Sequence, residues 1–342
     1  MPTTGLPLRP VVETRNDPIA IGRVTVPPGR KTRIELPFAH LPAGTEASLP
    51  IAVINGRTRG PNVWVSGGIH GDEINGVEVV RRVMRALDAK SLRGAVIAVP
   101  IVNPLGFMMR SRYSPDRRDL NRVFPGSPRG STASRLAHLF MKEVVSHCSV
   151  GIDCHTASSH RTNHPQLRAN IDDPPTLELA RAFGAPFTIK AKVRDGSLRQ
   201  AATEQGIKML LYEAGQADRL DDESVEFGFN GVMRTLRSLG MIEMRLPRAR
   251  ATTLVRSTRW VRARRGGLVE INPKLGDRVE AGEEIARISD AFGVRPTRVK
   301  TPSSGWVIAR TLNPLVNPGD PLLHVAAEQG PDVDEPAERR ST

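Results

Sequence analysis

The segment that decides the fold is Val63-Trp64-Val65-Ser66-Gly67-Gly68-Ile69-His70-Gly71-Asp72-Glu73. An apolar, partly β-branched run ends at two glycines, and a histidine and a glutamate follow at an interval of three residues. Beyond this segment, apolar residues recur at helical spacing from Ile74 to Leu87. The pattern predicts a strand, a tight turn and the start of a helix, with His70 and Glu73 at the turn.

The same pattern recurs along the chain and predicts the fold class. Residues 94–102 are nearly all apolar, as in a strand buried on both faces. Because a helix separates this strand from the one before, the two should run parallel. Strand and helix patterns alternate over residues 60–240. We therefore expect an α/β fold with a mixed, largely parallel sheet and helices on both faces, where ligands lie beyond the carboxyl ends of strands.

The composition changes at both ends of this α/β part, which we place at residues 45–247. Residues 1–44 predict a loose arm and a β-hairpin formed by residues 23–26 and 32–36. Residues 248–328 predict an all-β appendage of short strands. Residues 329–342 are acidic and polar, which predicts a disordered tail.

The all-β appendage contains an internal repeat. The pattern Val-x-x-Gly-x-x-[Ile/Leu] begins at Val279 and again at Val316. This duplication resembles the flattened barrel of biotinyl and lipoyl carrier domains, which present a modified lysine on the hairpin between the halves. Here that hairpin, residues 291–297, has no lysine at its tip, and Lys300 lies beyond it. We expect a β-barrel without an attached cofactor.

The composition limits the kinds of binding partner and the cellular compartment that we expect for this protein. The formal charge is +13, from 49 basic and 36 acidic residues, but the arginines are scattered and aromatic residues make up only 4%. A carboxylate substrate is therefore a better interpretation than nucleic acid. Cys148 and Cys154 form no disulfide framework. With no signal segment and no apolar run of membrane-spanning length, we expect a cytoplasmic protein without a membrane partner.

A third candidate ligand, His155, completes a candidate metal site. His155 follows an apolar run at 149–154, so it should lie at another carboxyl end of the same sheet, near His70 and Glu73. Two histidines and a carboxylate are ligands that zinc prefers in catalytic sites, where a fourth position remains for water. The alternative is that His70 lies near a helix N-cap and Glu73 is a first-turn carboxylate. We favour one Zn²⁺ per chain.

Two further features carry polar groups toward this region. Glu213 ends the strand pattern 207–212, either as a solvent-facing terminus or as a general base. The long segment 103–130 is rich in arginine, including Arg112 and Arg122, with Asn121 beside the latter. Such a segment is either a solvated basic loop or a device that captures a carboxylate and stabilises an oxyanion.

Together these residues resemble a known family. The matching elements, in order, are Gly68–Glu73, Asn103-Pro104, Arg112-Tyr113, Asp119-Leu120-Asn121-Arg122, Asp153-Cys154-His155-Thr156 and Tyr212-Glu213. They resemble the succinylglutamate desuccinylase/aspartoacylase family of zinc carboxypeptidase-like hydrolases over about residues 45–245, and a C-terminal barrel also occurs in that family. Cys154 departs from the apolar residue usual in the family and should point into the core.

The resemblance implies a role for each residue. Zinc would be bound by His70, Glu73 and His155, with Glu213 as the general base. Asn121 and Arg122 would bind the substrate carboxylate, and Arg112 would polarise the scissile carbonyl. The motifs do not fix the residues that recognise the acyl group; Arg168 is a candidate second anion-binding residue.

The resemblance implies zinc-dependent hydrolysis of an N-acyl amino acid. A zinc carboxypeptidase acting on acidic peptides is the main alternative, because it needs the same zinc and arginine. A non-enzymatic binding module is a second alternative, but it would not need Glu213. The hypothesis of a nucleic-acid-binding protein is supported only by the net charge. Co²⁺ or Mn²⁺ are possible substitutes for zinc, and a homo-oligomer is compatible with the sequence.

Overall fold

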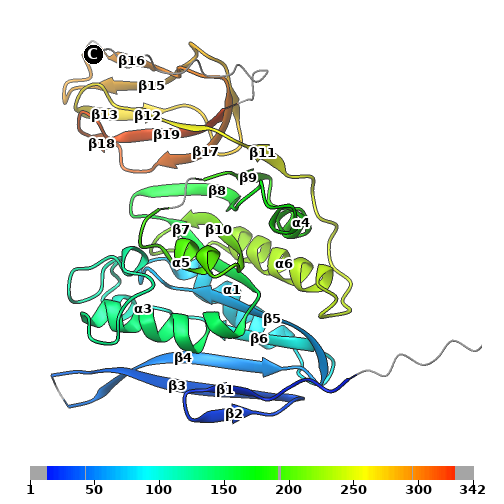
Figure 1. Ribbon diagram of the computed structural model, residues 1–342. Coiled ribbons are helices and arrows are strands. Elements are labelled where there is room, and N and C mark those ends of the chain that lie inside the picture. Colours follow the sequence, from blue (N-terminus) through cyan, green and yellow to red (C-terminus); the bar gives the residue numbers. More distant parts are fainter. Residues whose placement is uncertain (1–13, 43, 192–193, 295, 328–342) are drawn as a thin grey trace, which may run out of the picture.

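The computed structural model describes residues 14–42, 44–191, 194–294 and 296–327, and places them in one elongated molecule (Figure 1). The helices are α1 (Ile74–Ala86), α2 (Pro104–Met108), α3 (Thr132–Glu143), α4 (Pro174–Phe183), α5 (Leu198–Glu204) and α6 (Asp222–Ser238), with 3-10 turns at Leu120–Arg122 and Val145–His147. The strands up to residue 216 are β1 (Ile19–Ile21), β2 (Val24–Val26), β3 (Arg30–His40), β4 (Glu46–Asn55), β5 (Thr58–Gly67), β6 (Arg93–Val99), β7 (Val150–Ala157), β8 (Arg161–Arg168), β9 (Phe187–Ile189) and β10 (Lys208–Gln216). The later strands are β11 (Thr253–Val255), β12 (Thr258–Arg262), β13 (Gly267–Ile271), β14 (Arg278–Val279), β15 (Glu284–Ser289), β16 (Thr297–Lys300), β17 (Gly305–Thr311), β18 (Leu315–Val316) and β19 (Pro321–Ala327).

One mixed sheet runs through the molecule in the order β12-β19-β17-β8-β10-β7-β5-β6-β4-β3. Its centre is parallel: β10 pairs with β7, β7 with β5 and β5 with β6. The strands flanking this centre pair antiparallel, β8 on one side and β4 on the other. The mixed α/β sheet is thus as predicted, but its parallel pairs are limited to the central four strands and to the short strands β9 and β11 beside β8, so the expectation that it is largely parallel is wrong for the rest of the sheet.

Helices cover both faces of the central strands. On one face α3 and α5 pack against Trp64 and Ile97, and on the other α1, α4 and α6 pack against Val63 and Val65. Neighbouring residues of β5 thus enter opposite cores because side chains alternate along a strand. This double burial explains the nearly continuous apolar runs in the sequence.

The predicted N-terminal hairpin is wrong, because its two strands do not pair with each other. Residues 24–26 form β2 and pair with β1, across a turn at Gly22 (φ 57°), whereas residues 32–36 lie in β3 and pair with β4. The ladder between β3 and β4 is much longer and continues past Pro37 to His40. The long ladder gives β3 its register, and the residues before Thr14 lie outside those described.

The C-terminal strands continue the main sheet. Strand β17 pairs antiparallel with β8, and β19 and β12 follow β17 outward. A separate sheet, β16-β15-β13-β18, encloses an apolar cluster together with them, including Ile285, Val307 and Leu322. This region is therefore all-β and is joined to the α/β part by strand pairing; its likeness to a carrier-domain barrel stays a prediction, as do the domain boundaries. The predicted tail at 329–342 lies outside the described residues.

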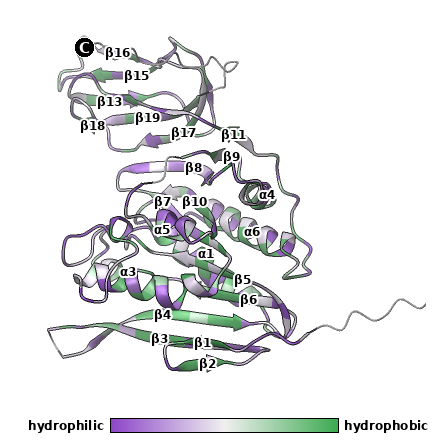
Figure 2. Ribbon diagram, in the orientation of Figure 1, coloured by the Kyte–Doolittle hydropathy of each residue, from purple (hydrophilic) through white to green (hydrophobic). Residues whose placement is uncertain are grey.

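Strand β8 was not predicted from the sequence. It reads Arg-Thr-Asn-His-Pro-Gln-Leu-Arg and is hydrophilic in Figure 2, in contrast to the central strands. A strand whose side chains line a polar cavity shows no apolar alternation, and Pro165 argues against a central strand. This strand supplies a wall of the site.

Candidate active site

The turn after β5 places His70 and Glu73 at the carboxyl end of the strand. Gly68 adopts φ 62°, which favours glycine, and Glu73 is the N-cap residue of α1. A Cβ at Gly71 would lie 2.0 Å from the carbonyl carbon of Gly106, so only glycine fits this approach to α2. The turn is therefore rigidly packed, and both side chains are buried.

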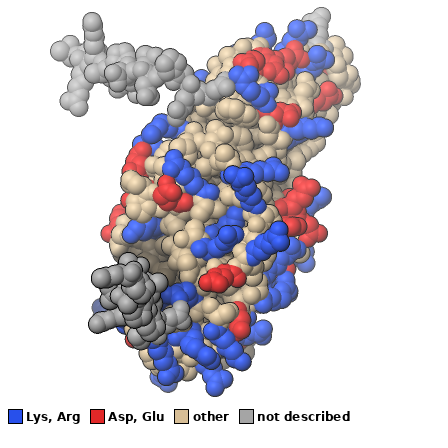
Figure 3. All heavy atoms as spheres, turned by 90° about the vertical axis from the view of Figure 1, so that its right-hand side faces the viewer, with Lys and Arg blue, Asp and Glu red and all other residues tan. Residues whose placement is uncertain are grey.

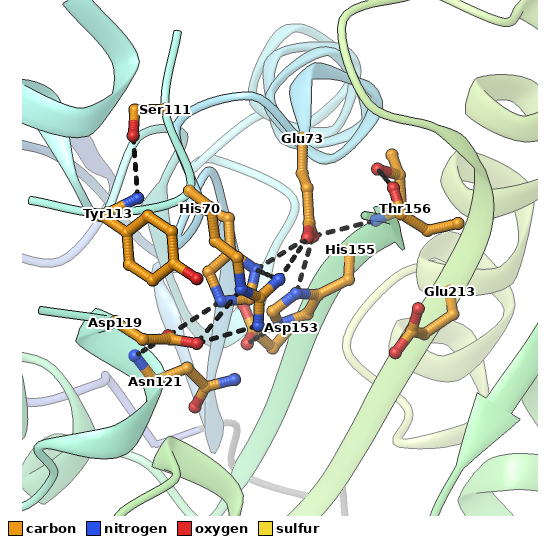
Figure 4. A network of polar contacts seen from close by, with 12 residues as sticks. His70, Glu73, Ser111, Tyr113, Asp119, Asn121, Asp153, His155, Thr156 and Glu213 are labelled. Carbon is orange, nitrogen blue, oxygen red and sulfur yellow. Dashed lines mark hydrogen bonds and ion pairs between the residues drawn. The ribbon is translucent and has the colours of Figure 1, made fainter. Parts of the chain in front are cut away.

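Strand β7 brings His155 to the same point. Gly67 pairs with Cys154, so the next residue on β7 lies beside the turn that follows β5. Nδ1 of His70 is 2.7 Å from Oε1 of Glu73, and Nδ1 of His155 is 2.9 Å from Oε2. Ligand atoms of all three residues lie within 4.8 Å of one another (Figure 4). The three residues predicted from the sequence as metal ligands are thus brought together.

The outer ring nitrogens of both histidines contact carboxylates. Nε2 of His70 is 3.1 Å from Oδ1 of Asp119, and Nε2 of His155 is 2.7 Å from Oδ2 of Asp153. A carboxylate on one ring nitrogen holds the proton there and leaves the other nitrogen as a metal ligand. Two inward Nδ1 atoms and one carboxylate form a donor set that suits zinc. The residues present therefore fit a divalent metal.

The charges of the cluster reinforce one another. Burial lowers the pKa of His70, but Glu73 and Asp119 more than offset it, so this pKa is raised. Burial acts likewise on His155, whose pKa Asp153 and Glu73 raise well above the usual value. Burial raises the pKa of Glu73, and the two imidazoles lower it further than burial raises it. The anionic cluster thus favours cationic groups at its centre.

Arg112 lies over this cluster from the segment between α2 and α3. Its Nε and Nη2 donate to Oδ2 of Asp119 at 3.1 and 2.9 Å, and its Nη1 lies 3.3 Å from Oε1 of Glu73. The guanidinium is half-buried, and the pKa of Arg112 is raised because Glu73 and Asp119 outweigh the effect of burial. Asp119 therefore orients both a candidate ligand and a cation beside it.

Glu213 lies on β10 next to His155 on β7, because the two residues are paired across the parallel ladder. Its Oε2 accepts a hydrogen bond from Nδ2 of Asn163 at 2.7 Å, and its Oε1 is 3.3 Å from Nε of Arg168. Figure 4 shows Glu213 set apart from the His-Glu-His cluster, across the site from Asp119. This separation leaves room for a reacting group between the cluster and the carboxylate.

Asn121 and Arg122 follow Asp119 on a 3-10 turn. Oδ1 of Asn121 accepts from the backbone N–H of Leu198, which fixes the turn against α5. Nη1 of Arg122 donates to the carbonyl oxygen of Asn121 at 2.5 Å, and the Arg122 side chain is exposed at the cavity. Burial and the neighbouring Arg194 lower the pKa of Arg122 although Asp119 opposes them.

All eight site residues expected from the sequence line one cavity of about 530 Å³. Six arginines line it as well as the acidic residues Asp72, Glu73 and Glu213; they are Arg112, Arg122, Arg161, Arg168, Arg194 and Arg199. Figure 3 shows that basic side chains are also scattered over one outer face, with acidic side chains among them. Such a lining suits an anionic ligand.

Sequence reasoning missed part of the site. Asp119 and Asp153 were visible as motif members without a role, and their contacts with histidine Nε2 atoms appear only in three dimensions. Asn163 and Arg161 gave no signal because β8 was not predicted.

No helix among the described residues is long and apolar enough to cross a membrane.

Comparison with known proteins identifies the family. A model of the succinylglutamate desuccinylase/aspartoacylase catalytic domain matches residues 59–239. The N-alpha-acetyl-L-2,4-diaminobutyric acid deacetylase of Halomonas elongata is 30% identical over 309 residues, which cover 84% of this chain and 90% of that protein. The chain belongs to the succinylglutamate desuccinylase/aspartoacylase family, as the motifs predicted.

Solved structures agree with this fold. A succinylglutamate desuccinylase/aspartoacylase from Rhodobacter sphaeroides superposes with a TM-score of 0.79 at 29% identity, covering 88% of this chain and 96% of that one. The product-bound ectoine utilization protein EutE (DoeB) from Ruegeria pomeroyi superposes with a TM-score of 0.80 at 24% identity, covering 92% and 100%. The second likeness concerns the fold alone.

Proposed function

We propose that this protein is a zinc-dependent amidohydrolase that releases a free amino acid from an N-acyl amino acid. The observation that carries the proposal is the convergence of Nδ1 of His70, Nδ1 of His155 and the Glu73 carboxylate in a cavity that also contains Glu213. Family membership and the deacetylase name of the Halomonas elongata relative support the reaction class.

The ligands would be His70, Glu73 and His155, with Asp119 and Asp153 holding the two imidazoles. When bound, zinc supplies Lewis-acid activation of a water molecule at neutral pH. The residues around it are buried and hydrogen-bonded, so they are arranged before a substrate arrives.

The remaining residues bind substrate and move protons. Asn121 and Arg122 would hold the substrate carboxylate, and Arg112 would donate to the carbonyl oxygen as negative charge develops there. Glu213 would accept a proton from the attacking water and give it to the leaving amine. Arg168 contacts Glu213, and a role for it in binding a second anionic group stays a prediction.

The test is release of free amine from a panel of N-acetyl and N-succinyl amino acids and short acidic peptides. We expect turnover of one N-acyl class, and a loss of roughly 10²- to 10⁴-fold for Glu213→Gln, because the amide cannot accept the proton. The matched control is Glu204→Gln, at an exposed position on α5, which should keep full activity.

Two results would contradict the proposal. One is a wild-type protein with bound zinc that turns over no N-acyl amino acid but cleaves peptides, which would indicate the carboxypeptidase alternative. The other is a Glu213→Gln variant as active as wild type, which would exclude the carboxylate as the base.

A further inference from the structure

Strand β8 holds a neutral side chain, Asn163, against the carboxylate of Glu213. The two side chains meet at 2.7 Å, from Nδ2 to Oε2, and Asn163 is only 7% exposed. A carboxylate only accepts hydrogen bonds, so the amide must present its NH₂ group. The other carboxylate oxygen lies near Nε of Arg168, on the same strand. Strand β8 therefore contacts both oxygens of Glu213.

An irregularity in the ladder puts Asn163 in this position. Glu213 of β10 pairs with Gln166, and Gly215 pairs with Asn163. Strand β8 therefore has one more residue than β10 between these two pairs. The extra residue marks a β-bulge, and Pro165 lies inside it, where a strand tolerates proline. Bulges re-aim side chains next to functional sites.

Regular pairing would give a different neighbour. Because side chains alternate between faces, an unbroken β8 would place His164 opposite Gly215, on the face of Glu213. With the bulge, the ring of His164 instead packs edge-on against Phe187, with ring centroids 5.5 Å apart. The bulge thus replaces a titratable ring by an amide beside the carboxylate.

The C-terminal strands fix the other edge of this segment. Asn163 pairs with Ala309 of β17, and the two residues before it on β8 also pair with β17. One of them, Arg161, lines the cavity and lies over the ring of Trp260 on β12, 5.7 Å from its centroid. The segment is therefore clamped between β10 and β17 and cannot move independently of either.

From this geometry we infer that Asn163 is a positioning residue that sets the orientation of the Glu213 carboxylate for proton transfer. Its role rests on the proposed function, because Glu213 is the general base only if the reaction is hydrolysis. The hydrogen bond from Asn163 to Oε2 and the ion pair of Oε1 with Arg168 restrict rotation of the carboxylate. Two cations also act on Glu213: Nε of Arg168 lies 3.3 Å from Oε1, and the charge of Arg199 attracts the carboxylate.

Two substitutions separate positioning from packing. Asn163→Ala removes the donor, and we expect kcat to fall on the order of 10- to 100-fold with KM little changed. Asn163→Asp keeps the shape but sets a second carboxylate against Glu213, so kcat should fall further than in Asn163→Ala. A space-filling role predicts the opposite order, because the isosteric aspartate would then be the milder change.

Asn62, on strand β5 and outside the cavity lining, offers matched controls. Its Nδ2 donates a hydrogen bond to the carbonyl oxygen of His147. Asn62→Ala and Asn62→Asp should lower thermal stability without the ordered loss of kcat. Crystal structures of the Asn163 variants add a readout that needs no substrate, and we expect the Glu213 carboxylate to be rotated in both. Unchanged kcat in Asn163→Asp, or an unrotated carboxylate in both variants, would overturn the inference. If wild type turns over no substrate, the proposed function fails while these structures still test the positioning.

Discussion

At His70 and His155, the ring nitrogen that faces away from the cluster determines what the inward nitrogen can do. Each Nε2 contacts a carboxylate, so each Nδ1 is available toward Glu73. The sequence predicted the three inward residues from type and spacing. It could not predict the contact of His70 with Asp119, because the two residues are 49 positions apart and meet only in the folded chain. Asp153 is only two positions from His155, but their spacing does not show which ring nitrogen the carboxylate contacts.

Arg122 tests how the substrate carboxylate is recognised. Its exposed guanidinium at the cavity should form a bidentate pair with a carboxylate, and Arg122→Ala should raise KM on the order of 10- to 100-fold with a smaller change in kcat. Arg122→Lys keeps the positive charge but cannot form the bidentate pair, so its KM should lie between those of the wild type and Arg122→Ala. Arg118→Ala, at an exposed position of the same loop, is the control, and an unchanged KM in Arg122→Ala would exclude this role.

At the scale of elements, periodic segments were predictable and polar ones were not. The helix after residue 73 follows from apolar spacing, and the apolar run predicted as a strand at 94–102 contains most of β6, which ends at Val99. Strand β8 was missed because its residues serve a cavity and a bulge rather than a core. The N-terminal hairpin was misassigned because pairing choices depend on the length of competing ladders, which local patterns do not contain.

Helix α1 tests the link between packing and site geometry. A Cβ at Gly76 would lie 2.2 Å from the carbonyl oxygen of Cys154, so Gly76→Ala should push α1 away from β7. Alanine usually favours helices, but overpacking here should cost roughly 1–3 kcal/mol of unfolding free energy. Glu73 and His155 would move apart, so zinc affinity should also fall. Measured stability and metal affinity equal to those of the exposed control Arg81→Ala would contradict this account.

At the scale of the whole molecule, one sheet joins the α/β part and the C-terminal strands. The change in sequence character near residue 248 was detectable, but pairing of β17 with β8 was not, because it joins segments about 150 residues apart. The predicted appendage is therefore continuous with the wall of the site. Its stability and that of the site should respond together.

His324 provides a pH test of that stability. It is 6% exposed and stacks on Trp260, and burial, with Arg168 adding to it, lowers the pKa of His324 to about 3. Below about pH 6.5 the unfolded chain takes up a proton that the folded chain refuses, so each pH unit lost should remove up to roughly 1.4 kcal/mol of unfolding free energy. His324→Phe keeps a stacked ring and should flatten the fall in Tm from about pH 6.5 to 4. Wild-type and His324→Phe curves that run parallel, as expected of the exposed control His40→Phe, would refute this.

The most direct test of the central claim is the metal content of the purified protein, measured by mass spectrometry after dialysis against trace zinc. We predict about one zinc per wild-type chain, little in folded His155→Ala, and wild-type content in His40→Ala, whose imidazole is exposed. Glu213→Gln should retain zinc while losing turnover, because its carboxylate is not one of the three converging ligands. A wild-type chain that binds no divalent metal, or zinc retained at the same level in His155→Ala, would contradict the account.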